Sequence, residues 1–218
     1  APPRWRLDDY RFWLPLLGLY SGARLSELCQ LRLGDIREEL GVWVISISSS
    51  GARQLKTVDS ERLVPLHKVI LDAGFLEFHQ QRLDATDGNL SATLFENLRV
   101  YGDLSPGHTA SRWFRGSDKD DKGYLGLCGL GDDELTFHGL RHTLINQFRR
   151  QKLDMLIGKA LVGHADRSTT GGYGDCYPSY VLKEELDKID FETSTTHILY
   201  NDYKALQAQQ GVFRIGRP

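Results

Sequence analysis

The stretches HGLRHT (residues 138–143) and LVGHADRSTTGGY (residues 161–173) decide the fold of this chain. In order, they hold four side chains that suit transfer of a phosphodiester: His138, Arg141, His164 and Tyr173. A phosphodiester in mid-transfer carries extra negative charge on its non-bridging oxygens, which fixed guanidinium and imidazole donors stabilise. A tyrosine hydroxyl, with an ordinary pKa of roughly 10, attacks poorly unless nearby cations stabilise its phenolate. The two stretches therefore indicate phosphodiester chemistry without a metal ion, with Tyr173 as the candidate nucleophile.

A third stretch, SGARLSELCQLRLGDI at residues 21–36, supplies a second guanidinium at Arg24 in the pattern Gly-x-Arg-x-x-Glu-Leu. With the two downstream stretches, it resembles the tyrosine recombinase (phage integrase) family. The catalytic set of that family is, in chain order, Arg, Lys, His-x-x-Arg, His or Trp, and Tyr. The matching residues here are Arg24, Lys56, His138, Arg141, His164 and Tyr173. The nine-residue spacing from the last histidine to the tyrosine also matches the family.

The resemblance implies an enzyme that recombines or integrates DNA at specific sites, as in phages and other mobile elements. Tyr173 would attack a DNA phosphorus, forming a 3′-phosphotyrosyl intermediate and releasing a 5′-hydroxyl strand. A second 5′-hydroxyl would then attack that intermediate, so that strands are exchanged without ATP. The implied partner is double-stranded DNA, on which the protein would assemble as a tetramer. The resemblance implies no metal and no other cofactor.

The resemblance also implies a role for each of the other matched side chains. Arg24 and Arg141 hold the non-bridging oxygens, and Lys56 protonates the leaving 5′ oxygen. His138 assists proton transfer from the tyrosine, and His164 hydrogen-bonds the phosphate. Lys56 is assigned by its place in a predicted hairpin, between a strand over residues 42–48 and one over residues 62–66.

The periodicity of apolar residues predicts an α+β fold that is mainly helical, with a small antiparallel sheet. Gly116 to Asp133 is rich in Gly and Asp without a clear period, and is predicted to be an exposed loop. The predicted helices run from Asp8 or Asp9 to about Gly22, from about Arg24 onward, from His138 onward, and over residues 67–83, 109–115, 154–161 and 178–188.

The domain organisation follows from the resemblance. Residues 1–218 are expected to form one catalytic domain, without the amino-terminal core-binding domain of the family. A tail over residues 190–218 is expected to pack on the domain or on a neighbouring protomer.

The composition agrees with a DNA-binding role only locally. The formal net charge is -2, which argues mildly against a nucleic-acid protein. Residues 136–152, however, hold four basic side chains and no acidic one, while acidic residues gather at 118–134 and 184–190. Three cysteines without CxxC spacing predict free thiols. No apolar stretch approaches the roughly 20 residues that span a bilayer, so a cytoplasmic location is expected.

Several alternatives stay open. His138 and His142 have the i, i+4 spacing of zinc ligands, and His164 could be a third ligand of a metal-dependent hydrolase. Tyr177 and Tyr180 compete with Tyr173 as the nucleophile. A type IB topoisomerase would share the chemistry but relax supercoils, and a DNA-binding remnant would have lost it.

Overall fold

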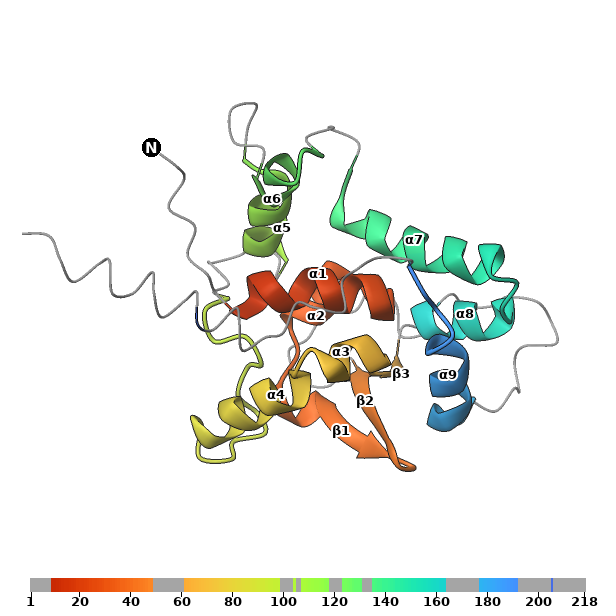
Figure 1. Cartoon of the computed structure of the whole chain (residues 1–218). Helices are drawn as coiled ribbons and strands as arrows, with labels where there is room; N and C mark the ends of the chain where they lie inside the picture. The colour runs from red at the N-terminus through yellow and green to blue at the C-terminus, as the bar shows by residue number, and fades with distance from the viewer. Residues whose placement is uncertain are drawn as a thin grey trace, which may run out of the picture.

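The computed structural model describes residues 9–48, 61–98, 104, 107–117, 123–130, 135–163, 177–191 and 205. Helices make up most of these residues and accompany one three-stranded antiparallel sheet, which confirms the predicted class (Figure 1). The elements are α1 Asp9–Ser21, α2 Leu25–Cys29, the 3₁₀ turn η1 Leu33–Asp35, β1 Ile36–Glu39, β2 Val42–Ile47, β3 Arg62–Pro65, α3 Lys68–Asp72, α4 Phe75–Asp84, α5 His108–Arg115, α6 Gly123–Leu127, α7 Phe137–Arg150, α8 Met155–Val162 and α9 Ser179–Leu186. Among these helices, none combines the length and the apolar character that crossing a membrane requires.

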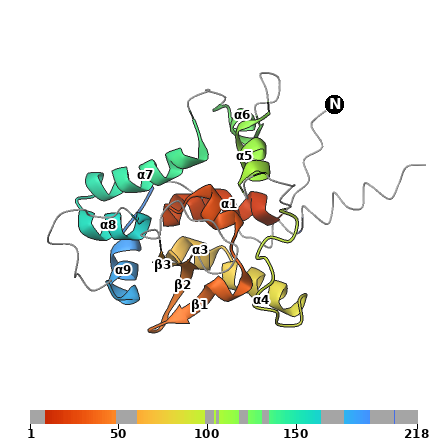
Figure 2. The ribbon, with the colours of Figure 1, turned by 180° about the vertical axis from the view of Figure 1, so that it is seen from behind.

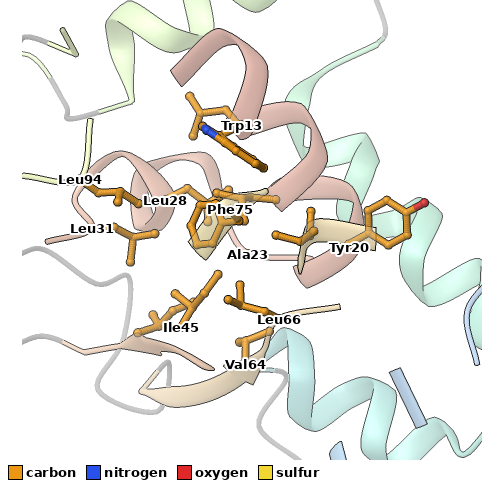
Figure 3. Close-up of a cluster of buried hydrophobic side chains, with 14 of the residues drawn as sticks. Trp13, Tyr20, Ala23, Leu28, Leu31, Ile45, Val64, Leu66, Phe75 and Leu94 are labelled. Carbon is orange, nitrogen blue, oxygen red and sulfur yellow. The ribbon is translucent and has the colours of Figure 1, made fainter. Parts of the chain in front are cut away.

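Helix α1 is the centre of the hydrophobic core. It is buried around most of its circumference, as expected of a helix whose apolar residues exceed one stripe. Trp13 is fully buried and packs edge-on against Phe75, with ring centroids 4.9 Å apart. Figure 3 shows Phe75 between Trp13 and the sheet residues Ile45 and Val64. Burial of each such side chain contributes about 1.5–3 kcal/mol, so this cluster fixes α1 against the sheet.

The sheet has the order β1-β2-β3, with Ile36 opposite Ile45 and Ile45 opposite Val64. The hairpin of β2 and β3 was predicted, whereas β1 was not. In β1 only Ile36 is buried, because the Arg-Glu-Glu that follows lies toward solvent and leaves no alternation to recognise. Lys56 stands between β2 and β3 in the sequence, within residues 49–60, which lie outside the described residues.

Two details of the sequence prediction were wrong. The helix expected over residues 67–83 is two helices, because Gly74 adopts a left-handed φ of 91° between α3 and α4. The loop expected over residues 116–133 contains α6. Tyr124 of α6 packs on Trp113 of α5 at a centroid distance of 5.1 Å, so aromatic packing stabilises a segment whose glycines hide its helical pattern.

The carboxyl-terminal helices lie together at one end of α1. Both views show α7 alongside α1, with α8 and then α9 beneath it (Figures 1 and 2). Gly18 allows the close approach of α7, because a Cβ there would lie 2.5 Å from the Phe137 ring. Helix α9 packs on β3, and the Ser179 hydroxyl donates to the Glu39 carbonyl at 2.7 Å. Helices α8 and α9 therefore both pack against the sheet, through β3.

Candidate active site

Arg24 is fixed at the turn between α1 and α2. It is the N-cap of α2, and its backbone N–H donates to Oε2 of Glu27 at 2.8 Å. Its side chain Nη1 donates to Oε1 of the same carboxylate at 2.7 Å. A glutamate at the third helical position commonly accepts from the N-cap backbone in this way. Both the backbone and the side chain of Arg24 are thus positioned by Glu27.

Glu27 is itself deeply buried, with 2% of its side chain exposed. Its Oε2 also accepts from Nη2 of Arg62 at 2.9 Å. Burial opposes the charged carboxylate, but the hydrogen bond and charge of Arg62, with the bonds from Arg24, outweigh it and lower the pKa of Glu27. Glu27 is therefore an ionised carboxylate shared by two guanidinium groups.

Arg141 reaches the same region from α7. It is 2% exposed, and its Nη1 donates to the carbonyl oxygen of Gly22 at 2.9 Å. Its Nη2 is buried and has no hydrogen-bond partner within the described part of the chain. Burial lowers the pKa of Arg141 to about 10, and the positive charges of Arg62 and Arg24 act in the same direction. Arg141 stays charged near neutral pH.

The cluster of Arg24, Arg62, Arg141 and Glu27 carries an excess of positive charge. Arg24 and Arg62 bond to the Glu27 carboxylate, and Arg141 lies close enough to be influenced by the charges of all three. Guanidinium groups are always charged and match the oxygens of a phosphate in geometry. A partly buried site amplifies their attraction for an anion because screening is weaker there. The arrangement is suited to binding a phosphodiester.

His138 lies in the first turn of α7, one turn before Arg141, and is exposed. Its ring contacts that of His142 edge-to-face, with centroids 4.8 Å apart and planes at 87°. Over the described ranges, no three His, Cys, Asp or Glu side chains form a group that could hold a metal ion. His164, the third ligand of the alternative metal site, lies outside these ranges.

The structure brings together Arg24 and Arg141, which are 117 positions apart in the sequence. Lys56, His164 and Tyr173 lie outside the described residues, so their predicted places in the site stay predictions. The same holds for the assignment of catalytic roles to all six residues, His138 included.

Sequence reasoning missed Glu27 and Arg62 as members of the site. Glu27 has a recognisable signal, since it stands three residues after an N-cap, where a carboxylate reaches back to the cap. Arg62 had only its place at the start of a predicted strand, and its bond to Glu27 spans 35 residues of sequence.

Comparison with known proteins identifies the family. Residues 11–179 match the model of the phage integrase family, and the chain belongs to that family. It is 30% identical over 184 residues to tyrosine recombinase XerA of Pyrococcus horikoshii, covering 83% of this chain and 55% of that protein. It is 31% identical over 161 residues to tyrosine recombinase XerD of Proteus mirabilis, covering 71% of this chain and 44% of that protein.

A solved structure agrees with the sequence comparisons. The crystal structure of XerA recombinase superposes with a TM-score of 0.50 at 25% identity, covering 77% of this chain and 55% of that one. The chain thus spans about half the length of the relatives that it matches.

Proposed function

We propose that this chain carries the catalytic centre of a site-specific DNA recombinase, which cleaves and rejoins strands through a 3′-phosphotyrosyl bond at Tyr173. The observation that carries the proposal is the convergence of Arg24 and Arg141 on one positively charged cluster. Arg141 is held by Gly22 through Nη1, while its buried Nη2 has no partner within the described residues. A buried donor without a partner is costly, and a phosphate oxygen would satisfy it.

The proposed reaction uses each side chain for one task. Arg24 and Arg141 stabilise the charge that develops on the non-bridging oxygens, and loss of one such donor lowers a rate by about 10² to 10³-fold. Lys56 protonates the leaving 5′ oxygen. His138 takes part in proton transfer from Tyr173. His164, the sixth proposed residue, hydrogen-bonds the phosphate.

Double-stranded DNA is the proposed substrate, with several copies of the protein acting together on recombining DNA. Exposed arginines on two helices support contact with phosphates: Arg112 and Arg115 in the last turn of α5, and Arg149 and Arg150 in the last turn of α7. Contacts of this kind release counterions, so binding should weaken steeply as salt is raised.

The test of the proposed function is formation of a covalent adduct. The chain and its Tyr173→Phe variant are incubated with nicked suicide fragments of DNA from the source genome, in which the cleaved strand end diffuses away. The wild-type chain is expected to form a denaturant-resistant adduct that peptide mass places on Tyr173.

Tyr180→Phe is the matched control, because Tyr180 lies on α9 with 56% of its surface exposed. This variant should form the adduct like the wild type. An adduct that persists in Tyr173→Phe would show that another residue is the nucleophile.

A further inference from the structure

Arg62 lies where three segments of the chain meet. It opens strand β3, and its Nη2 donates to Oε2 of Glu27 in α2 at 2.9 Å. Its Nε donates to the carbonyl oxygen of Leu161, in the last turn of α8, at 2.8 Å. One planar guanidinium thus connects the sheet to the helix that begins at Arg24 and to the helix that ends at Gly163.

The geometry of this connection is narrowly constrained. The Arg62 side chain is 6% exposed and that of Glu27 is 2% exposed, so water does not compete strongly for either charge. The guanidinium presents its N–H donors in a rigid fork, and here the fork fits a carboxylate on one edge and a carbonyl on another. Any displacement of Arg62 therefore displaces both partners.

The lack of a side chain at Gly163 allows close contact between Arg62 and the end of α8. Gly163 ends α8 in a left-handed conformation with φ of 68°, and a Cβ at this position would lie 3.0 Å from Nη1 of Arg62 and 3.1 Å from its Cδ. The absence of a side chain at Gly163 lets the backbone lie directly on Arg62. The next residue in the sequence is His164.

We propose that Arg62 is a positioning residue for the strand-transfer chemistry, and this inference rests on the proposed function. Through Glu27 it sets the guanidinium of Arg24, and through Leu161 and Gly163 it sets the point at which the chain leaves α8 toward His164. Its Nε and Nη2 bond to protein oxygens, so its task is to hold the neighbouring groups in place.

The test compares Arg62→Gln and Arg62→Lys with Arg82→Gln as the matched control. Arg82 makes bonds of the same two kinds outside the cluster, through Nε to the Leu94 carbonyl at 3.3 Å and through Nη1 to Glu96 at 2.6 Å. Two quantities are measured well below each variant's unfolding temperature. The first is backbone amide exchange over residues 24–30 and 155–163 without DNA. The second is the single-turnover rate of adduct formation at saturating nicked DNA.

Arg62→Gln is expected to speed exchange in both segments and to lower the adduct rate at least tenfold. Arg62→Lys keeps the positive charge but loses the planar guanidinium, so its adduct rate should lie between that of Arg62→Gln and that of the wild type. Arg82→Gln should change neither quantity.

Three results would overturn the proposal: unchanged exchange in both segments, an unchanged adduct rate in Arg62→Gln, or full rescue by lysine, which would show that charge alone matters. If Arg62→Gln does not fold, the proposal is tested on Arg62→Lys with the same measurements of amide exchange and adduct rate. Absence of an adduct with the wild-type chain would count against the proposed function, whereas amide exchange would still show whether Arg62 holds the two segments.

Discussion

The guanidinium of Arg141 donates to the carbonyl oxygen of Gly22 at 2.9 Å, and so connects α7 to the turn between α1 and α2 across 119 residues of sequence. Gly22 has a φ of 61°, a left-handed conformation that glycine adopts without steric strain. Arg24 follows two residues later. The turn after α1 therefore holds Arg141 through Gly22 and carries Arg24, the two arginines of the proposed active site.

Gly22→Ala should lower the free energy of unfolding by about 2–4 kcal/mol, from backbone strain and from overpacking. The added Cβ would lie 2.7 Å from Cγ1 of Val162 and 3.0 Å from Cδ2 of Leu144. Urea denaturation measures the loss. Gly41→Ala is the control, since Gly41 has a φ of 77° but no atom within 4 Å of the added Cβ, and it should lose only about 1 kcal/mol. Equal losses would mean that packing around Gly22 is unimportant.

The helices that the sequence predicted well have an apolar stripe and a clear boundary residue. Helix α8 is an example, because the Asp154 carboxylate accepts from the Leu156 N–H at 2.8 Å at its start and Gly163 ends it. The elements that sequence reasoning missed lack such signals. Strand β1 has one buried residue, and α6 is stabilised by the packing of Tyr124 on Trp113 rather than by its own propensity.

Residues of the candidate site could be predicted from the sequence only where they stand in a motif of characteristic spacing. Arg24 and Arg141 were found because each stands in such a motif, and the structure brings both into one cluster. Arg62 was missed because its bond to Glu27 joins residues far apart in the sequence. A pairing of that kind depends on how β3 packs beside α2, and no local pattern encodes it.

Glu27→Gln should destabilise the chain by about 3 kcal/mol near pH 7, because it leaves the buried Arg62 without its countercharge. The pKa of Glu27 is lowered in the folded chain, so its contribution is complete above the ordinary value of 4.5 and declines as the pH falls through the folded pKa. The difference between wild type and variant, measured by denaturation, should therefore shrink in acid. Glu96→Gln, with 67% of the side chain exposed, should cost less than about 1 kcal/mol. A difference for Glu27→Gln that does not change with pH would contradict the ionised state.

Arg141→Lys should leave the fold intact and lower the rate of adduct formation by about 10²-fold or more. Arginine presents its donors in a fixed planar fork, so one nitrogen can bond to the Gly22 carbonyl while the other faces a phosphate. The compact ammonium group of lysine lacks this geometry. Single-turnover kinetics on nicked DNA measure the rate, and far-UV circular dichroism measures the fold. Arg37→Lys, at an exposed position of β1, is the control and should keep the wild-type rate. A wild-type rate in Arg141→Lys would remove Arg141 from the proposed chemistry.

His67 connects α3 to the chain that follows α9. It is 1% exposed, stacks on Tyr20 at a centroid distance of 4.4 Å, and accepts through Nδ1 from the Val69 N–H at 3.1 Å. Its Nε2 lies 3.2 Å from the carbonyl oxygen of Ile189 and must donate to it. The ring is therefore neutral, with its proton on Nε2, and a second proton on Nδ1 would remove the cap of α3.

Burial lowers the pKa of His67 to about 4; the charge of Asp187 acts against this shift, and that of Lys183 acts with it. As the pH falls below the ordinary value of 6.5, the unfolded chain takes up this proton before the folded one, so stability declines between about 6.5 and 4. Between pH 7 and pH 5 the free energy of unfolding of the wild type should fall by about 2 kcal/mol more than that of His67→Asn. The asparagine amide can still cap α3 but does not titrate. Urea denaturation at both pH values measures the difference. The control His142→Asn, at an exposed position on α7, should keep the wild-type pH dependence, and an equally steep decline in His67→Asn would show that other groups cause it.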